Sequence, residues 1–164
     1  MPLVSAAPNS HPLIDNRQSD RAMRVRRGAQ LLLTEMGFAV LAELSLANGR
    51  RADLTASGKD GSIWIIEIKA SVEDLRADHK GHDYEEFCDA FAFATLPDVP
   101  QSIFPKEVGF IVADNFGAEI IVQPSQQKKL SAARRKAMML RIARAASQKL
   151  MTAEWAAKND KPMP

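Results

Sequence analysis

The stretch that decides the fold is Ile63-Trp64-Ile65-Ile66-Glu67-Ile68-Lys69, which is apolar except near its end. Successive residues of a strand point to opposite faces, so Glu67 and Lys69 share one face. Both faces of the stretch begin apolar, which is typical of a central strand buried on both sides. Because an unpaired buried charge is costly, the two charged residues indicate either an ion pair at the strand end or a functional site.

A second acidic residue, Asp53, precedes this strand. Between them lies Ser57-Gly58-Lys59-Asp60-Gly61-Ser62, a run of turn-forming residues that predicts a hairpin. A strand with Asp53, a hairpin and a strand with Glu67 and Lys69 bring two carboxylates and a lysine together. The alternative is that Asp53 is a turn residue and that Glu67 and Lys69 only pair with each other.

Two converging carboxylates favour a divalent metal ion, Mg²⁺ or Mn²⁺, because such ions take oxygen ligands. We expect Asp53 and Glu67 to bind the ion, with the backbone carbonyl of Ile68 as a further ligand. A bound metal ion lowers the pKa of water and stabilises the charge of a phosphodiester transition state. Lys69 is then expected to position the attacking water or to neutralise developing charge.

The length and composition of the chain fit one globular domain. It has 164 residues, of which 46% are hydrophobic, and a single cysteine, Cys88. No intramolecular disulfide can form, which is typical of a reducing compartment, so we expect a cytoplasmic protein. No segment has the length and apolar character of a membrane span, and the first residues lack the pattern of a secretion signal. A phosphate loop of the Walker type is absent from the sequence, which argues against an ATPase.

The charges are distributed unevenly along the chain, although the net charge is only +2. Residues 31–122 include 7 basic and 16 acidic side chains, whereas residues 123–164 include 10 basic and 2 acidic ones. An acidic middle with basic flanks suits a metal site served by phosphate-binding arms. Ordinary solvated helix faces are the alternative interpretation of the flanks.

The patterns of apolar and turn-forming residues predict an α/β sandwich with a mixed sheet flanked by helices. We expect a disordered leader over residues 1–17, one domain over 18–152 that includes a basic C-terminal helix, and a flexible tail over 153–164. The expected helices are residues 20–36, 71–76, 83–93 and 131–151, and the expected strands are residues 38–46, 51–56, 62–70, 108–113 and 118–122.

Three runs carry a family resemblance: Gly49-Arg50-Arg51-Ala52-Asp53-Leu54, the stretch from Ile63 to Lys69, and Phe91-Ala92-Phe93-Ala94-Thr95-Leu96-Pro97. Over residues 21–148 the chain resembles the bacterial MmcB family of DNA repair-related proteins, within the PD-(D/E)xK nuclease superfamily. The resemblance implies a restriction-endonuclease-like αβββαβ core and Mg²⁺-dependent action on DNA in repair. Asp53, Glu67 and Lys69 match the superfamily's motif, whereas Ala52 stands in place of its proline.

The third acidic ligand is not fixed by the motif, and Glu35 and Glu43 are both candidates. Glu43 lies in an alternating strand close to Asp53 in sequence, so we favour it. A solvent-facing strand residue is the alternative interpretation of Glu43.

Basic residues of the C-terminal helix are candidates for binding DNA. An apolar stripe of Met139, Ile142, Ala143, Ala146 and Leu150 is expected to dock on the sheet. The opposite side of the helix is then expected to face outward and to contact phosphates through Arg134, Arg141, Arg144 and Lys149. Lys80 and Tyr84, with Asp83, are candidates for the rim of the site, although for Asp83 we favour helix capping.

Three functions remain after this reading of the sequence. The first is a metal-dependent nuclease that acts on DNA in repair. The second is a DNA-binding repair module whose site is dormant, and the third is an adapter whose acidic middle binds a basic partner. The run His79-Lys80-Gly81-His82 is too short to supply a structural zinc site. The sequence leaves the oligomeric state open.

Overall fold

The computed structural model describes residues 19–77, 81–124 and 128–159. The leader expected over residues 1–17 therefore lies outside the described residues. The order of the elements confirms the α/β class and most of the expected boundaries. The helices are α1 (Asp20–Glu35), α2 (Val72–Ala77) and α3 (Ala132–Asn159), with short 3₁₀ helices η1 (Gly81–Phe87) and η2 (Gln101–Ile103). The strands are β1 (Ala39–Ser45), β2 (Arg51–Ser57), β3 (Ile63–Ile68), β4 (Ala90–Thr95), β5 (Gly109–Ala113) and β6 (Ala118–Val122).

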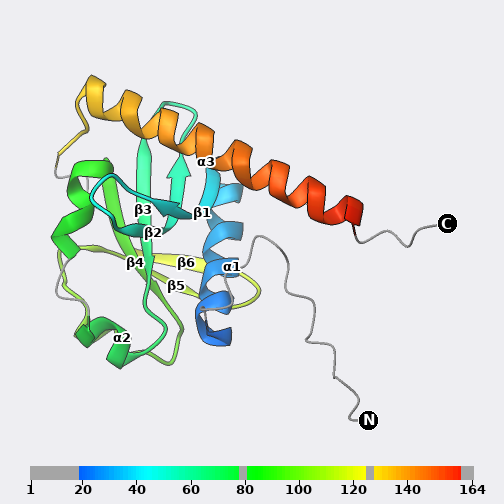
Figure 1. Cartoon of the computed structure of the whole chain (residues 1–164). Coiled ribbons are helices and arrows are strands. Elements are labelled where there is room, and N and C mark those ends of the chain that lie inside the picture. The colour runs from blue at the N-terminus through cyan, green and yellow to red at the C-terminus, as the bar shows by residue number, and fades with distance from the viewer. Residues whose placement is uncertain (1–18, 78–80, 125–127, 160–164) are drawn as a thin grey trace, which may run out of the picture.

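The six strands form one mixed sheet in which sequence order equals spatial order (Figure 1). The pairs β1–β2, β2–β3 and β5–β6 are antiparallel, whereas β3–β4 and β4–β5 are parallel. Parallel neighbours need a crossover connection, which α2 and η1 supply between β3 and β4. The carboxyl ends of β3, β4 and β5 consequently lie at one edge of the sheet, where ligands of open α/β sheets commonly bind.

The two faces of the sheet differ in the size of their side chains. One face carries a chain of aromatic contacts from Tyr84 through Phe91, Phe93 and Phe104 to Phe110. Because Tyr84 belongs to η1, this short helix covers the aromatic face. On the other face the strand register aligns smaller residues, and α1, which contacts all six strands, packs there. The aligned positions are Ala42, Leu54, Ile66, Ala92 and Gly109.

Helix α1 begins at a cap and approaches the sheet closely at Gly28. The hydroxyl of Ser19 accepts a hydrogen bond from the backbone N–H of Ala22 at 3.2 Å, which is a standard N-cap. A Cβ atom at Gly28 would lie 2.2 Å from the carbonyl oxygen of Asp114 and 2.3 Å from that of Gly117. The absence of a side chain at Gly28 is therefore what lets α1 lie against the β5–β6 turn.

We expect Gly28→Ala to destabilise the protein by roughly 1–3 kcal/mol, because a backbone shift must relieve two contacts with carbonyl oxygens. The gain in helix propensity, about 1 kcal/mol, offsets only part of this cost. Gly117→Ala is the matched control, since a Cβ at Gly117 would meet nothing within 4 Å. Urea denaturation measures both. A Gly28→Ala protein as stable as the parent would contradict the close approach.

The helix expected over residues 83–93 is wrong. Only Gly81–Phe87 are helical, as η1, and Ala90–Thr95 form the central strand β4, in which every residue is buried. The register places Phe93 beside Phe110, on the aromatic face, and Ala92 beside Gly109, on the other face. Alanine and phenylalanine both count as apolar, so the alternation of large and small side chains escapes a pattern based on polarity alone.

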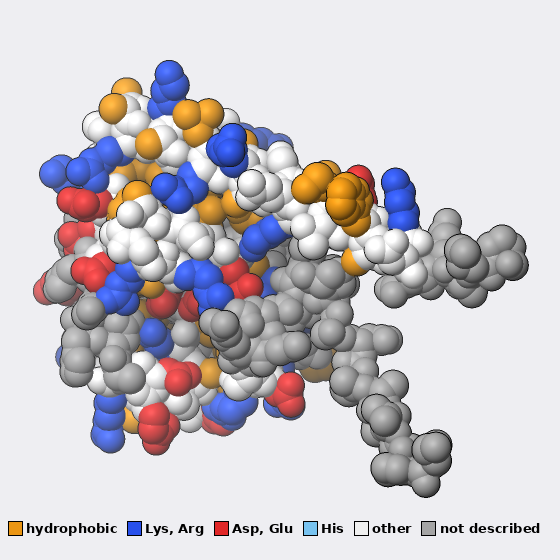
Figure 2. All heavy atoms as spheres, viewed as in Figure 1, with side chains coloured by type: hydrophobic (Ala, Val, Ile, Leu, Met, Phe, Trp, Pro, Cys, Tyr) orange, Lys and Arg blue, Asp and Glu red, His pale blue; other side chains and the backbone are white. Residues whose placement is uncertain are grey.

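Helix α3 is longer than expected and ends at Asn159 rather than near Met151. It runs along the top of the view and its C-terminal part projects from the body of the molecule (Figure 1). Figure 2 shows hydrophobic side chains gathered on this projecting part, where Leu150, Met151 and Trp155 are exposed. In the described part of the chain, no helix combines the length and hydropathy that crossing a membrane requires.

A buried carboxylate ties the start of α3 to the sheet. Asp89 is 5% exposed and forms a two-fold ion pair with Arg135, at 2.6 Å to Nη1 and 2.8 Å to Nη2. It also accepts hydrogen bonds from the N–H groups of Ile63 at 2.8 Å and Leu130 at 2.9 Å. Burial opposes ionisation of Asp89, but the hydrogen bonds from Arg135, Leu130 and Ile63 outweigh it and lower its pKa to about 2.

Candidate active site

The central feature of the candidate site is the place where β2 and β3 part. Their ladder ends at the pair Leu54–Ile66. Beyond this pair β2 continues beside β1 as far as Arg51, and β3 continues beside β4 as far as Ile68. Each strand therefore keeps its outer neighbour and loses its inner one, which leaves backbone groups between them for other partners.

Asp53 lies on β2 just where the strands part. Its Oδ2 accepts a hydrogen bond from the N–H of Ile68 at 2.8 Å, so the carboxylate takes the place of a missing ladder bond. Burial raises the pKa of Asp53, while the Ile68 hydrogen bond and the charge of Lys69 partly offset the effect and Glu43 adds to it. A nearby cation stabilises the ionised form of such a carboxyl group, and so opposes the rise in pKa that burial causes.

Glu67 and Lys69 are both buried at the end of β3, with 7% and 8% exposure. The Nζ of Lys69 lies 3.8 Å from Oε1 of Glu67, so the ion pair of the alternative interpretation is present. The backbone of Lys69 bonds towards β4, since its N–H donates to Ala94 and its carbonyl accepts from Thr95. Backbone groups alternate in direction along a strand, so the carbonyl of Ile68 points to the gap beside β2.

Tyr84 from η1 completes the surroundings of Glu67. Its hydroxyl donates to Oε1 of Glu67 at 3.1 Å and lies 3.4 Å from the carbonyl oxygen of Arg51. Burial and the charge of Glu67 raise the pKa of Tyr84 far above its usual range, so the phenol remains a neutral donor. η1 is held against the β1–β2 turn by an ion pair of 2.8 Å between Arg50 and Asp83.

Glu43 stands on β1 opposite Asp53, because Ala42 pairs with Leu54 and Leu44 with Ala52. Its φ of 57° lies in the left-handed region, which is rare for a residue with a side chain and costs on the order of 1–3 kcal/mol. Its Oε1 is 4.0 Å from Nη2 of Arg51. Glu35, the other candidate third ligand, is exposed at the end of α1. Of the two acids, only Glu43 lies near enough for its charge to raise the pKa of Asp53.

The orientation expected for α3 is confirmed in part. Within the expected docking stripe, Met139, Ile142 and Ala146 are half-buried, whereas Ala143 and Leu150 are exposed, and Met138 is the buried residue of the helix. Two of the four residues expected to face outward lie towards β1 instead. Arg141 donates to the carbonyl of Ser45 at 3.1 Å, and Lys149 donates to the carbonyl of Ala42 and lies 3.4 Å from that of Glu43.

The remaining basic residues of the expected DNA surface are distributed differently. Arg134 is exposed and pairs with Glu86 at 3.4 Å, and Arg144 is exposed. Lys80 lies outside the described residues. Burial lowers the pKa of Lys149, and the charges of Arg26 and Arg51 lower it further against the effect of Glu43. Lys149 therefore belongs to the surroundings of the strand parting and not to an outer basic face.

The parting of β2 and β3 thus brings together Asp53, Glu67, Lys69 and the carbonyl of Ile68. In this conformation, the described residues include no group of three His, Cys, Asp or Glu side chains arranged to hold a metal ion. Two carboxylates with a backbone carbonyl nonetheless make an oxygen donor set of the kind that Mg²⁺ uses, because this ion keeps several waters.

A family model described as "DNA repair protein MmcB-like" matches residues 9–157 of the chain. The chain belongs to the MmcB-like family. This match confirms the resemblance seen in the sequence. It takes in all three runs that carry the resemblance, together with every residue of the strand parting.

Solved structures extend the comparison of this MmcB-like chain. A Silicibacter pomeroyi protein of unknown function is 32% identical, with a TM-score of 0.80, over 89% of this chain and 98% of that one. A repair endonuclease from Pyrococcus abyssi is 20% identical, with a TM-score of 0.33, over 55% of this chain and 42% of that one. None of the curated proteins compared with the chain matches it.

Sequence reasoning missed the parts of the site that depend on packing. The hydrogen bond from Tyr84 to Glu67 joins η1 to β3, although Tyr84 was expected near the rim. The contact of Lys149 with β1 joins residues 107 positions apart in this MmcB-like chain. The left-handed backbone of Glu43 has no marker in its sequence, since glycine is the usual residue at such positions.

Proposed function

We propose that the protein is a metal-dependent DNA nuclease that acts in DNA repair. The observation that carries the proposal is the convergence of Asp53 and Glu67, with Lys69 beside Glu67, where β2 and β3 part. Burial of carboxylates and a lysine at a strand end costs free energy, and such groups are concentrated at functional sites. Membership of a DNA repair family supports DNA as the substrate.

In this proposal Asp53, Glu67 and the carbonyl of Ile68 hold Mg²⁺ or Mn²⁺. When bound, the ion supplies a water of lowered pKa and stabilises charge on the phosphodiester. Lys69 holds a positive charge next to the scissile phosphate and orients the water that attacks it. Tyr84 keeps Glu67 in place by donating to its Oε1.

A cleavage assay tests this proposal. We expect the protein to cut DNA in the presence of Mg²⁺ or Mn²⁺ but not of EDTA, when single-stranded, duplex, flap and abasic substrates are compared. Asp53→Asn should abolish cutting because it removes a ligand charge while keeping the size of the side chain. Failure of the folded parent protein to cut any of the four substrates with either metal ion would overturn the nuclease proposal.

Metal binding gives a prediction that does not depend on cleavage. We expect calorimetry to detect Mn²⁺ binding, and Asp53→Asn and Glu67→Gln each to weaken it by about tenfold or more, as loss of groups at metal sites commonly does. Glu35→Gln is the matched control because Glu35 is exposed and outside the site. Unchanged affinity in both site variants would count against the metal site, and Glu43→Gln reports whether Glu43 contributes.

One observation favours a second candidate, a DNA-binding repair module without cleavage. Glu67 and Lys69 are nearly covered, and Tyr84 and Ile68 already occupy oxygen atoms of Glu67 and Asp53. Such contacts also suit a site that has become purely structural. The two candidates differ in the assay above, since the second predicts DNA binding by the parent protein with no metal-dependent cutting.

A further inference from the structure

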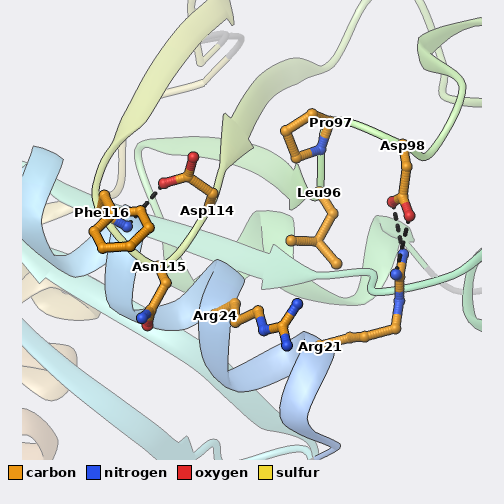
Figure 3. A pocket seen from close by; sticks show the side chains of 8 residues that line it. All are labelled: Arg21, Arg24, Leu96, Pro97, Asp98, Asp114, Asn115 and Phe116. Carbon is orange, nitrogen blue, oxygen red and sulfur yellow. Dashed lines mark hydrogen bonds and ion pairs between the residues drawn. The ribbon is translucent and has the colours of Figure 1, made fainter.

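A cavity of about 480 Å³ lies at the carboxyl edge of the parallel strands, away from the strand parting. It lies between the first turns of α1, the segment after β4 and the β5–β6 turn (Figure 3). The side chain of Arg21 links it to the end of β3, because its Nε donates to the carbonyl of Ala70 at 3.1 Å. Ala70 follows Lys69 directly, so a residue that lines the cavity contacts the same strand end that carries the candidate active site.

Among the charged side chains that line the cavity, Arg24 is available to bind a ligand. Arg21 forms a two-fold ion pair with Asp98, at 2.7 and 3.0 Å. Asp114 accepts hydrogen bonds from the N–H groups of Phe116 at 2.8 Å and Gly117 at 3.1 Å, so it shapes the turn. Arg24 is exposed and makes no hydrogen bond or ion pair with any residue that the structure describes. Figure 3 shows its guanidinium group directed into the cavity, towards Leu96.

The apolar groups of the cavity include an aromatic ring with little burial. Phe116 is 86% exposed at the tip of the β5–β6 turn, which makes it the most exposed of the large hydrophobic side chains in the described part of the chain. The turn itself is fixed, because Asp114 bonds to two of its N–H groups. Leu96 and Pro97 add apolar surface on the facing side of the cavity. An exposed ring on a fixed turn, beside a guanidinium that pairs with no described residue, matches the chemistry of a nucleotide, which has a flat base and a phosphate.

We propose that this cavity binds an unpaired nucleotide of single-stranded DNA, with the base stacked on Phe116 and a backbone phosphate at Arg24. Bases in a duplex are stacked on each other and do not present a free face to Phe116, so the site selects unpaired strands. The side chain of Asn115 and the remaining acceptor capacity of Asp114 lie where they can bond to a base edge. The inference rests on the proposed function only in taking DNA as the ligand.

The test is fluorescence anisotropy with a labelled single-stranded oligonucleotide and a blunt duplex, in EDTA so that no cleavage occurs. We expect Phe116→Ala to weaken single-strand binding roughly 5- to 150-fold, the range for loss of one stacked base, and to change duplex binding little. Phe116→Tyr should keep the affinity because it keeps the ring. Arg24→Ala should reduce the slope of log affinity against log salt on single strands by about 0.7, the contribution of one phosphate contact.

Two control variants match these substitutions in kind. Trp155→Ala removes an exposed aromatic ring from the projecting part of α3, and Lys59→Ala removes an exposed cation from the β2–β3 turn. Neither should change single-strand affinity. The proposal is overturned if the parent protein does not bind single strands, or if Phe116→Ala binds them as the parent and the Trp155→Ala control do. Equal losses on single strands and duplex overturn it as well. Loss of cleavage with an intact Phe116 effect rejects only the nuclease proposal.

Discussion

Lys69→Ala is expected to lower the rate of metal-dependent DNA cleavage by about 100-fold or more while leaving DNA affinity nearly unchanged. The lysine is 8% exposed and lies 3.8 Å from Glu67, so its charge is held in place before any substrate arrives. Removal of such a preorganised group commonly costs ~10²–10³-fold in rate. An effect on turnover without an effect on affinity is what a group acting in the transition state predicts. Single-turnover cleavage and anisotropy measure the two quantities.

The control for this prediction separates catalysis from folding. Lys69→Met keeps most of the length of the side chain without its charge and should lose the same activity, whereas Lys59→Ala, at an exposed turn, should lose none. Circular dichroism checks that each variant is folded. If folded Lys69→Ala protein cleaves at the parental rate, Lys69 has only the role of an ion-pair partner for Glu67.

Asp89→Ala is expected to destabilise the fold by roughly 3–5 kcal/mol, the range for removing one partner of a buried ion pair. The carboxylate accepts from Arg135 and from the N–H groups of Ile63 and Leu130. In the variant these two N–H groups lose their acceptor, and Arg135 keeps only carbonyl acceptors, such as that of Gly61 at 2.8 Å. The matched control is Asp98→Ala, which removes a two-fold pair with Arg21 whose side chains are 43% and 64% exposed. Exposed pairs contribute about 1 kcal/mol or less, so the control should change stability little. Urea denaturation compares the two.

The same carboxylate predicts how stability depends on pH. The pKa of Asp89 is lowered to about 2 in the folded protein, against about 3.9 for an unperturbed aspartate. Its contribution is therefore complete above pH 4 and is lost as the pH falls from about 4 to about 2. Denaturation at a series of pH values should show a shallower loss in this window for Asp89→Ala. An unchanged acid profile would mean that Asp89 does not titrate as its contacts imply.

The sequence predicted most of the fold because β3 and its neighbours carry strong local patterns. The hairpin residues 57–62 fixed the β2–β3 connection, and the apolar run from Ile63 to Lys69 fixed a buried central strand. The prediction failed for β4, because its residues alternate in size, with Phe91 and Phe93 between alanines, and do not alternate in polarity. The sequence predicted that α3 is a helix. Which of its apolar residues pack on the core is determined by tertiary packing, and the helical pattern alone does not specify it.

The candidate site also contains residues that the sequence predicted and residues that it did not. Asp53, Glu67 and Lys69 were predictable because charged residues within apolar strands are conspicuous. The roles of Tyr84 and Lys149 were not, because each reaches the site from an element far along the chain. The metal ion, the chemistry and the binding of DNA remain predictions that the experiments above test.

The single cysteine offers a way to observe how the site opens. Cys88 is 3% exposed and its thiol donates to the carbonyl of Tyr84 at 3.3 Å, so it sits directly behind the residue that contacts Glu67. Burial, and then the charge of Asp89, raises the pKa of the thiol to about 12, which leaves it almost without reactive thiolate at neutral pH. A thiol reagent therefore modifies the protein only as fast as the segment from Tyr84 to Cys88 moves away. Because the chain has no other cysteine, the rate of thiol modification in the wild-type protein reports how often this segment moves away from Glu67. The rate can be measured with and without DNA or Mn²⁺.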